Sequence, residues 1–279
     1  MNMTKTINDT NNDVALKMSV RLKEIAELLR CPEKLKVADV GCDHGYVSIY
    51  LVTHGIAKEC IAMDVRSGPL SGAKDNIDEY GLSDSIRTRL SDGVKELKQG
   101  EADALVIAGM GGNLMRKILE EGKPAELGIK TAVLQPQSDI ADFRQFLRDS
   151  GFVITDEKVI EEEGKFYFPM KVSLVITETS ASHDNPGGSF ESAISLIKKV
   201  TGNADDGQLL RICNRYGECN ILNRDETLEK YLLHGKKVCE SILKNLDEKE
   251  HSGRIQEITT ELSDIDTALK VMQEERVCL

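Results

Sequence analysis

Residues 37–48, VADVGCDHGYVS, place Asp43 and His44 in a turn between two glycines, directly after an apolar run. Such residues belong either to a hydrophilic loop or to a ligand site. A dinucleotide site would carry G-x-G-x-x-G, so that backbone amides could approach a pyrophosphate. Asp43 stands at the second glycine of that pattern, where its charge would repel a pyrophosphate. The turn therefore favours a cofactor that has a cationic centre and no phosphates, and S-adenosylmethionine (SAM) fits that description.

Acidic residues also follow the next two apolar runs. Asp64 lies about twenty residues beyond the first turn and is followed by Val65, and a carboxylate at this distance can accept hydrogen bonds from both ribose hydroxyls. Asp92 and Gly93 follow residues 85–90, where a carboxylate could hold an adenine amino group. Capping of the next helix is the alternative explanation at both positions.

The AGMGG segment is the most unusual part of the sequence. Gly109, Gly111 and Gly112 leave exposed backbone N–H groups at a helix start, suited to a flat base or to the methyl-donor end of SAM. A tight turn that needs positive φ is the alternative. After the following apolar run, Gln135, Pro136 and Gln137 offer amide donors and acceptors for the edge of a substrate.

Metal binding and thiol catalysis find little support in the same residues. Asp43 and His44 make only two ligands without a third nearby, so no metal is expected. Cys42 has no convincing catalytic partner and is expected to pack as a small apolar residue. The seven cysteines are scattered and show no CxxC pair, which fits reduced thiols in a cytoplasm.

These residues are positioned by strands that alternate with helices of about ten to fifteen residues, a pattern typical of an α/β fold with a doubly wound, mostly parallel sheet. Ligands in such sheets lie beyond the carboxyl ends of the strands, where the polar turns fall. Two long strands around Gly164 are expected to close the sheet, the last one antiparallel. The other expected strands are 36–40, 59–65, 85–90, 102–109 and 130–136, and the expected helices are 18–29, 46–53, Pro69 to Gly81, 113–121 and 139–149.

The C-terminal part of the chain has a different pattern. Residues 178–190 are rich in Ser, Asn, Gly and Pro and are expected to form a linker. Beyond it, apolar residues recur in alternating steps of three and four over 228–246 and again over 255–272. These heptad patterns, separated by a break at 251–253, predict an antiparallel helical hairpin that resembles a short coiled coil.

Composition limits the class of protein. The 279 residues are 40% hydrophobic and 30% charged, enough for one domain and a smaller second one, and no stretch approaches the ~18 apolar residues of a membrane span. Residues 1–16 are polar and expected to form a disordered lead-in, which leaves domains at 17–177 and 191–279. The net charge of −11 counts against bulk attraction to nucleic acid, although a local basic face can lie on an acidic protein.

Six segments together resemble the bacterial tRNA (adenine-22-N1)-methyltransferase family. The joint occurrence of DVGCDH, GPL and AGMGG is more specific than any single glycine motif, and the resemblance covers roughly residues 17–176. It implies a class I SAM-dependent, Rossmann-like domain followed by a helical coiled-coil domain. The segments are RLKEIAELL (21–29), VADVGCDHGYVSIYL (37–51), AMDVRSGPL (62–70), LSDGVKEL (90–97), VIAGMGG (106–112) and LQPQSD (134–139).

The resemblance also implies a reaction, which is methyl transfer from SAM to N1 of an adenine in tRNA. Asp43 and His44 are expected to orient the base or the amino-acid end of SAM, and Tyr46 to stack or donate a hydrogen bond. Arg21, with Lys17 and Lys23 on the first helix, is a candidate phosphate contact, and a solvated helix face is the alternative. The residues expected to hold SAM or line the transfer site are Gly41, Asp64, Val65, Asp92, Gly93, Gly109, Met110 and Gly111.

Two other functions are also compatible with the sequence. The enzyme could methylate a small molecule or a protein, which the acidic charge slightly favours. Alternatively, the chain could be a non-catalytic SAM- or nucleotide-binding module whose coiled coil recruits a partner. We expect a cytoplasmic monomer or weak dimer, with tRNA as its substrate and neither a metal nor a membrane as a partner.

Overall fold

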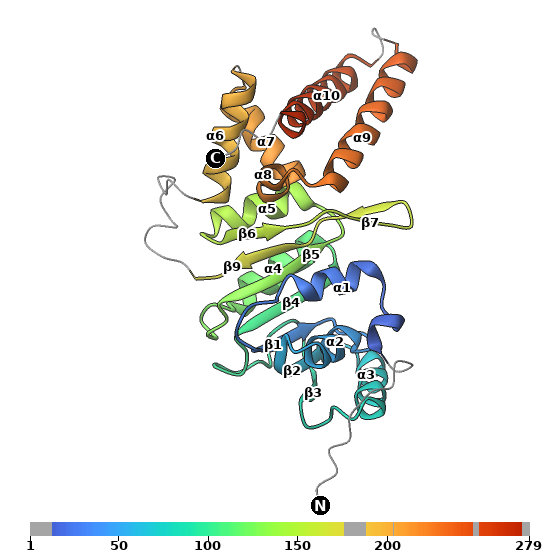
Figure 1. The fold of residues 1–279 in the computed structure, drawn as a ribbon, viewed down its shortest axis with the longest axis vertical. Helices are drawn as coiled ribbons and strands as arrows, with labels where there is room; N and C mark the ends of the chain where they lie inside the picture. The colour runs from blue at the N-terminus through green and yellow to red at the C-terminus, as the bar shows by residue number, and fades with distance from the viewer. Residues whose placement is uncertain (1–12, 176–187, 203, 248–250, 275–279) are drawn as a thin grey trace, which may run out of the picture.

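The computed structural model describes residues 13–175, 188–202, 204–247 and 251–274, and its core is a seven-stranded sheet with the strand order β3-β2-β1-β4-β5-β9-β6 (Figure 1). Strands β1 to β5 pair in parallel, whereas β9 runs antiparallel to both of its neighbours. The predicted doubly wound, mostly parallel sheet is confirmed. Its strands are β1 (Leu35–Val40), β2 (Ala57–Asp64), β3 (Ile86–Leu90), β4 (Ala104–Met110), β5 (Thr131–Pro136), β6 (Val153–Glu157) and β9 (Met170–Ser173).

Helices cover both faces of the sheet because successive strand residues point to opposite sides. Val37 joins the apolar core under the N-terminal helices, and its neighbour Ala38 joins the core on the opposite face. On the first face lie η1 (Val14–Lys17), α1 (Val20–Glu27), α2 (Tyr46–Thr53) and α3 (Ser67–Glu79), and on the second lie α4 (Gly112–Gly122) and α5 (Ile140–Asp149). The Ser19 hydroxyl accepts the Leu22 N–H, as expected of the cap of α1.

The hairpin around Gly164 differs from the prediction of two long strands. Its outer parts, β6 and β9, pair within the main sheet, whereas β7 (Ile160–Glu162) and β8 (Lys165–Tyr167) form a separate two-stranded ribbon. The two ladders are separated at Pro169, which has no N–H to donate. The ribbon therefore leaves the sheet and packs beside α1.

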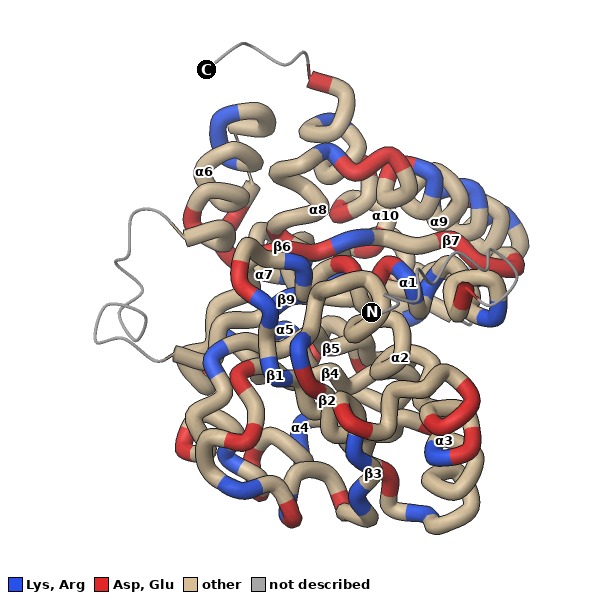
Figure 2. Tube along the Cα trace, turned by 60° about the horizontal axis from the view of Figure 1, so that its bottom comes forward, with Lys and Arg blue, Asp and Glu red and all other residues tan. Residues whose placement is uncertain are grey.

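Helices make up the described part of the chain beyond residue 187. The two heptad patterns form α9 and α10, which run antiparallel: Lys236 Nζ lies 2.6 Å from Asp266 Oδ1, and Arg224 Nε donates to the carbonyl of Val271. The predicted helical hairpin is therefore confirmed, and basic residues recur along α9 (Figure 2). The helices are α6 (Ser189–Thr201), α7 (Asp206–Tyr216), α8 (Glu218–Asn223), α9 (Glu226–Asn245) and α10 (Ser252–Gln273).

Two expected boundaries need adjustment. The lead-in predicted at 1–16 lies outside the described residues up to position 12, but Val14 begins η1 and is buried in the core, so the prediction of disorder is wrong for its last residues. The linker predicted at 178–190 lies outside the described residues up to position 187, and Ser189 already begins α6. No helix among the described residues is long and apolar enough to cross a membrane.

Candidate active site

A cavity of about 630 Å³ opens at the carboxyl ends of β1, β2 and β4. The strand order reverses between β1 and β4, which is where α/β sheets place their ligands. Most of the residues predicted from the sequence meet there. Those in its wall are Arg21, Gly41, Asp43, His44, Tyr46, Asp64, Val65, Asp92, Gly93, Gly109 and Met110.

The turn after β1 depends on glycine at its first position. Gly41 has a φ of +77°, and a Cβ atom there would overlap the Met110 methyl group. The N–H groups of Gly41 and Cys42 both donate to the carbonyl of Met63, at 2.8 and 3.0 Å. The turn is thus anchored to β2, and Met110 reaches it from β4.

Asp43 and His44 lie exposed on this turn, at the wall of the cavity. Asp43 adopts a left-handed conformation with a φ of +46°. Asn76 Nδ2 of α3 donates to the His44 carbonyl at 2.8 Å, and the His44 and Tyr46 rings lie 5.9 Å apart between centroids. The three side chains are therefore available to a ligand at the mouth of the cavity.

Cys42 does not share this exposure. It is buried, and burial raises the pKa of its thiol far above the ordinary value. A thiol with a raised pKa remains protonated and unreactive. The structure therefore agrees with the prediction that Cys42 packs as a small apolar residue.

Asp64 ends β2 with its side chain 6% exposed. Its Oδ1 accepts the N–H of Arg66 at 2.8 Å, while the Arg66 side chain lies mostly in solvent with its Nε 3.7 Å from the same oxygen. The carboxylate is thus oriented by the backbone rather than neutralised by a buried cation.

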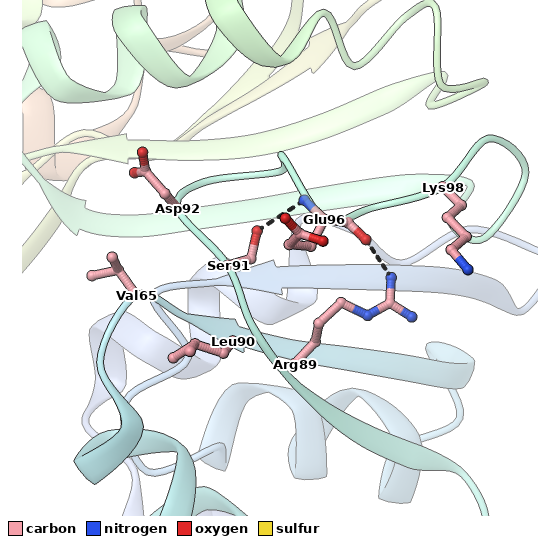
Figure 3. Close-up of a pocket in the computed structure, with 7 residues that line it drawn as sticks. All are labelled: Val65, Arg89, Leu90, Ser91, Asp92, Glu96 and Lys98. Atoms are coloured by element: carbon pink, nitrogen blue, oxygen red, sulfur yellow. Dashed lines mark hydrogen bonds between the residues drawn. The ribbon is translucent and has the colours of Figure 1, made fainter.

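Asp92 and Val65 lie at the border between this cavity and a shallower hollow of about 670 Å³. Figure 3 shows these two side chains at one end of the hollow, with Arg89 and Lys98 at the other. Lys95 Nζ lies 2.5 Å from Asp92 Oδ2, and this hydrogen bond lowers the pKa of the Asp92 carboxyl. Asp92 therefore stays ionised and exposed at the edge of the cavity.

Asp39 is a member of the site that the sequence-based prediction missed. It lies within β1, is 4% exposed, and lines the cavity. Its pKa is raised to about 6, mainly by burial and to a smaller extent by the nearby Asp64, while the hydrogen bond from Ser48 Oγ at 2.7 Å opposes the rise. The available signal was an ionisable residue in an otherwise apolar run, two positions before Gly41.

Arg21 lies in the cavity wall, but its guanidinium is already engaged. Nη1 donates to Gln135 Oε1 at 2.8 Å, Nε lies 3.7 Å from Glu162 Oε2, and the group stacks 4.9 Å from the Tyr167 ring centroid. Lys17, expected beside it, belongs instead to η1 and pairs with Glu79. Arg21 therefore joins α1, β5 and the β7–β8 ribbon.

Three of the expected contacts do not reach the cavity wall. Gln135 is fully buried and uses both ends of its amide, since Nε2 donates to the Pro136 carbonyl and Oε1 accepts from Arg21. Gln135 therefore cannot meet a substrate in this arrangement. Pro136 lines a separate hollow, and Gly111 caps α4 against Ser138. Gln137, two residues further on, lines the cavity instead.

Within the part of the chain that the structure describes, no three His, Cys, Asp or Glu side chains are grouped to hold a metal ion. The site instead combines two buried carboxylates with open glycine turns. Buried anionic groups in an open cavity favour a cationic ligand.

Comparison with known proteins relates the chain to methyltransferases. A family model described as a methyltransferase domain matches residues 18–170, more than half of the chain. The tRNA (adenine(22)-N(1))-methyltransferase of Bacillus subtilis is 40% identical over 152 residues, which are 54% of this chain and 63% of that enzyme. The alignment thus spans less than two thirds of the relative's length.

Solved structures extend the similarity to the C-terminal helices. The crystal structure of Streptococcus pneumoniae Sp1610, a putative tRNA (m1A22) methyltransferase, has a TM-score of 0.72 at 27% identity and covers 90% of this chain and 99% of that one. The same protein in complex with S-adenosyl-L-methionine has a TM-score of 0.69 at 26% identity. The whole two-part architecture is therefore shared.

Proposed function

The chain belongs to the methyltransferase-domain family, and we propose that it transfers a methyl group from SAM to N1 of adenine 22 in tRNA. The observation that carries the proposal is the 40% identity to the Bacillus subtilis enzyme over 152 residues. A methyltransferase domain near 17–177 is followed by a helical domain that begins with α6. The protein acts in the cytoplasm as a monomer or weak dimer.

The cavity suits SAM by the chemistry of its wall. Asp39 and Asp64 are buried carboxylates, and among the described residues neither has a buried lysine or arginine beside it. Asp64 would accept the ribose hydroxyls, Asp39 would complement the positive end of the ligand, and Asp92 would meet the adenine amino group. When bound there, SAM supplies an electrophilic methyl group.

The acceptor atom needs positioning more than activation. Adenine N1 already has a lone pair, so the protein's task is to align it with the methyl group rather than to remove a proton. N1 lies on the Watson–Crick edge, and the nucleotide must therefore leave its stack to enter the site. His44 and Tyr46 lie at the mouth of the cavity, where they can orient the extruded base, and Met110 lines the transfer site.

Contacts with the tRNA backbone require exposed cations on this acidic protein. Lys230, Lys237 and Lys244 lie exposed along α9, and no ion pair involves them among the described residues. Each lysine that neutralises a phosphate steepens the salt dependence of binding. The helical domain therefore supplies backbone contacts while the cavity supplies the chemistry.

A methylation assay with transcribed tRNA and methyl-labelled SAM tests the proposal. We expect label in 1-methyladenosine at position 22, and none in a tRNA that has guanine there. Calorimetry with SAM and NAD side by side should show binding of SAM alone. Label in a small molecule or protein instead of tRNA would support the first alternative, and SAM binding without any transfer would support a non-catalytic module. Intact methylation by both Asp43→Ala and Asp64→Ala would refute the assigned site.

A further inference from the structure

A second hollow, of about 450 Å³, lies between the end of β5 and the β7–β8 ribbon. It adjoins the cofactor cavity, because Gln137 lines both. Its wall combines a side-chain amide, aromatic rings and an exposed ammonium group. The residues are Pro136, Gln137, Ile140, Lys165, Phe166 and Tyr167.

Gln137 lies at the border between the two spaces. Its backbone N–H donates to the Met110 carbonyl at 2.8 Å, and a Cβ atom on Gly109 would lie 3.7 Å from its Nε2. The side chain is exposed, and no hydrogen bond to it occurs among the described residues. Its amide is thus held beside the AGMGG turn with its donor and acceptor free.

The aromatic part of the hollow is fixed from both sides. Tyr167 stacks against Arg21, which is bound to Gln135, and Phe166 packs edge-on against Tyr231 of α9 with 5.1 Å between centroids. Rings that are already held in place can receive a planar base with little loss of side-chain entropy. The same packing links the hollow to the helical domain.

Lys165 completes the set of groups that a nucleotide requires. It lies exposed at the start of β8, and it forms no ion pair within the described part of the chain. An aromatic wall, a free amide and an unpaired cation correspond to the base, the base edge and the phosphate of a nucleotide.

We propose that this hollow receives the acceptor nucleotide, and that Gln137 pairs with the N6/N7 edge of its adenine. A glutamine amide accepts from N6–H and donates to N7 of adenine at the same time. That contact leaves N1 free for methylation, whereas a contact to the Watson–Crick edge would cover it. Guanine presents two acceptors on the same edge, so the Gln137 carbonyl would lose its partner. This inference rests on the proposed function.

The test pairs an enzyme substitution with a single-atom change in the substrate. A ligated tRNA with 7-deaza-adenine at position 22 lacks only the N7 acceptor. Relative to natural tRNA, we expect the wild-type enzyme to lose about ten-fold in kcat/KM on it, and Gln137→Ala to lose about ten-fold on natural tRNA. Gln137→Ala should then be indifferent to the 7-deaza change, since the bond is already absent.

The outcomes separate this inference from the function on which it rests. If wild-type enzyme methylates both tRNAs equally, Gln137 does not contact N7 and the inference is overturned. The inference is also overturned if the losses in kcat/KM caused by Gln137→Ala and by the 7-deaza substitution multiply when the two are combined. If wild-type enzyme methylates neither tRNA, the proposed function itself fails. Calorimetry should show unchanged SAM affinity for Gln137→Ala, which separates loss of base contact from damage to the cofactor site.

Lys165 provides an independent check with a matched control. Lys165→Gln should raise the KM for tRNA about three-fold or more with little change in kcat, and should make binding less dependent on salt. Lys130→Gln removes another exposed lysine, just before the opposite end of β5, and should leave both constants unchanged. Equal effects of the two substitutions would show that Lys165 acts only through net charge.

Discussion

Buried carboxylates occur in two regions of this molecule, and their surroundings are opposite. At the junction between the sheet domain and the helical domain, Glu157 and Glu218 face Arg144 and Arg148, with N–O distances of 2.8 and 3.1 Å. In the cofactor cavity, Asp39 and Asp64 have no buried cation beside them among the described residues. One region is electrostatically complete without a ligand, and the other is not.

Buried carboxylates with a buried arginine beside them serve the structure, whereas buried carboxylates without one are candidates for ligand binding. Burial raises the pKa of Glu157 to about 7, although the charge of Arg144 opposes the rise, and burial raises the pKa of Asp39 to about 6. In the junction Arg144 and Arg148 neutralise the buried carboxylates of Glu157 and Glu218, and these contacts hold α7 and α8 against α5 and β6. In the cavity the charge is left for a cationic ligand to compensate.

Arg144→Met should have the largest effect, because it leaves Glu157 buried without its partner. It also removes the donor to the carbonyls of Asn214 and Arg215. Breaking a buried pair in this way costs about 3–5 kcal/mol. The measurement is the urea midpoint followed by far-UV circular dichroism, since the chain has no tryptophan.

The double substitution Arg144→Met, Glu157→Met serves as its control. Removing both charges replaces the pair by apolar volume and should recover at least half of the lost stability. SAM affinity should change little in either variant, because the junction lies outside the cavity wall. A loss of less than about 1 kcal/mol in the single variant would show that the junction tolerates an unpaired carboxylate.

Asp64→Asn should show the reverse pattern, with a large loss of SAM affinity and a small change in the free energy of unfolding. The asparagine Oδ1 can still accept the Arg66 N–H, so the turn keeps its hydrogen bond. Losing hydrogen bonds to a charged group costs about 1.5–3 kcal/mol, which corresponds to about ten- to a hundred-fold in SAM affinity. Calorimetry measures this, and an affinity within two-fold of the wild type would contradict the assignment of Asp64.

The ionisation of Asp39 should make SAM affinity change about ten-fold with pH. Its pKa of about 6 lies above the ordinary value of 3.8, so the ligand-free protein loses stability as pH rises from about 4 through 6 and the buried carboxyl ionises. The ionised form is the one that attracts a cation. SAM should therefore bind about ten-fold more weakly at pH 5 than at pH 7, a range in which its amino group stays protonated.

Asp39→Asn should remove most of this pH dependence, with affinity low at both pH values. Calorimetric titration of both proteins at pH 5, 6 and 7 compares the two slopes. An equally steep slope in the variant would show that Asp39 is not the group whose ionisation controls SAM affinity.

The sequence predicted the cavity better than the junction, for a physical reason. Parallel strands bring their carboxyl ends to one edge, so Asp43, Asp64 and Asp92 could be placed together from strand order alone. Asp39 was missed because its role depends on burial within a strand. Arg144 and Glu157 lie on different elements as ordinary charged residues, and only tertiary packing buries them together.

Local sequence patterns also did not predict how the residues around Gly164 divide between two sheets. The segment around Gly164 has strand composition throughout, but Pro169 divides it between the main sheet and the β7–β8 ribbon. Gln135 was expected to face a substrate because it ends a strand, yet Arg21 from a distant helix occupies its amide. Such long-range contacts have no signal in a single sequence.

The smallest effect on stability is expected for an exposed ion pair between α9 and α10, which tests whether exposure or distance determines how much an ion pair stabilises the fold. Lys236 Nζ and Asp266 Oδ1 lie 2.6 Å apart, closer than Arg144 and Glu157, but their side chains are 36% and 50% exposed. Solvent already stabilises both charges, so Lys236→Gln should leave the urea midpoint almost unchanged. A double-mutant cycle with Asp266→Asn isolates the coupling energy, which should fall further in high salt because exposed charges are screened. A coupling energy as large as that of the Arg144–Glu157 pair would show that a short distance stabilises an ion pair whether or not it is buried. Burial of Asp39 and Asp64 without a buried cation beside them, among the described residues, would then no longer support a ligand site.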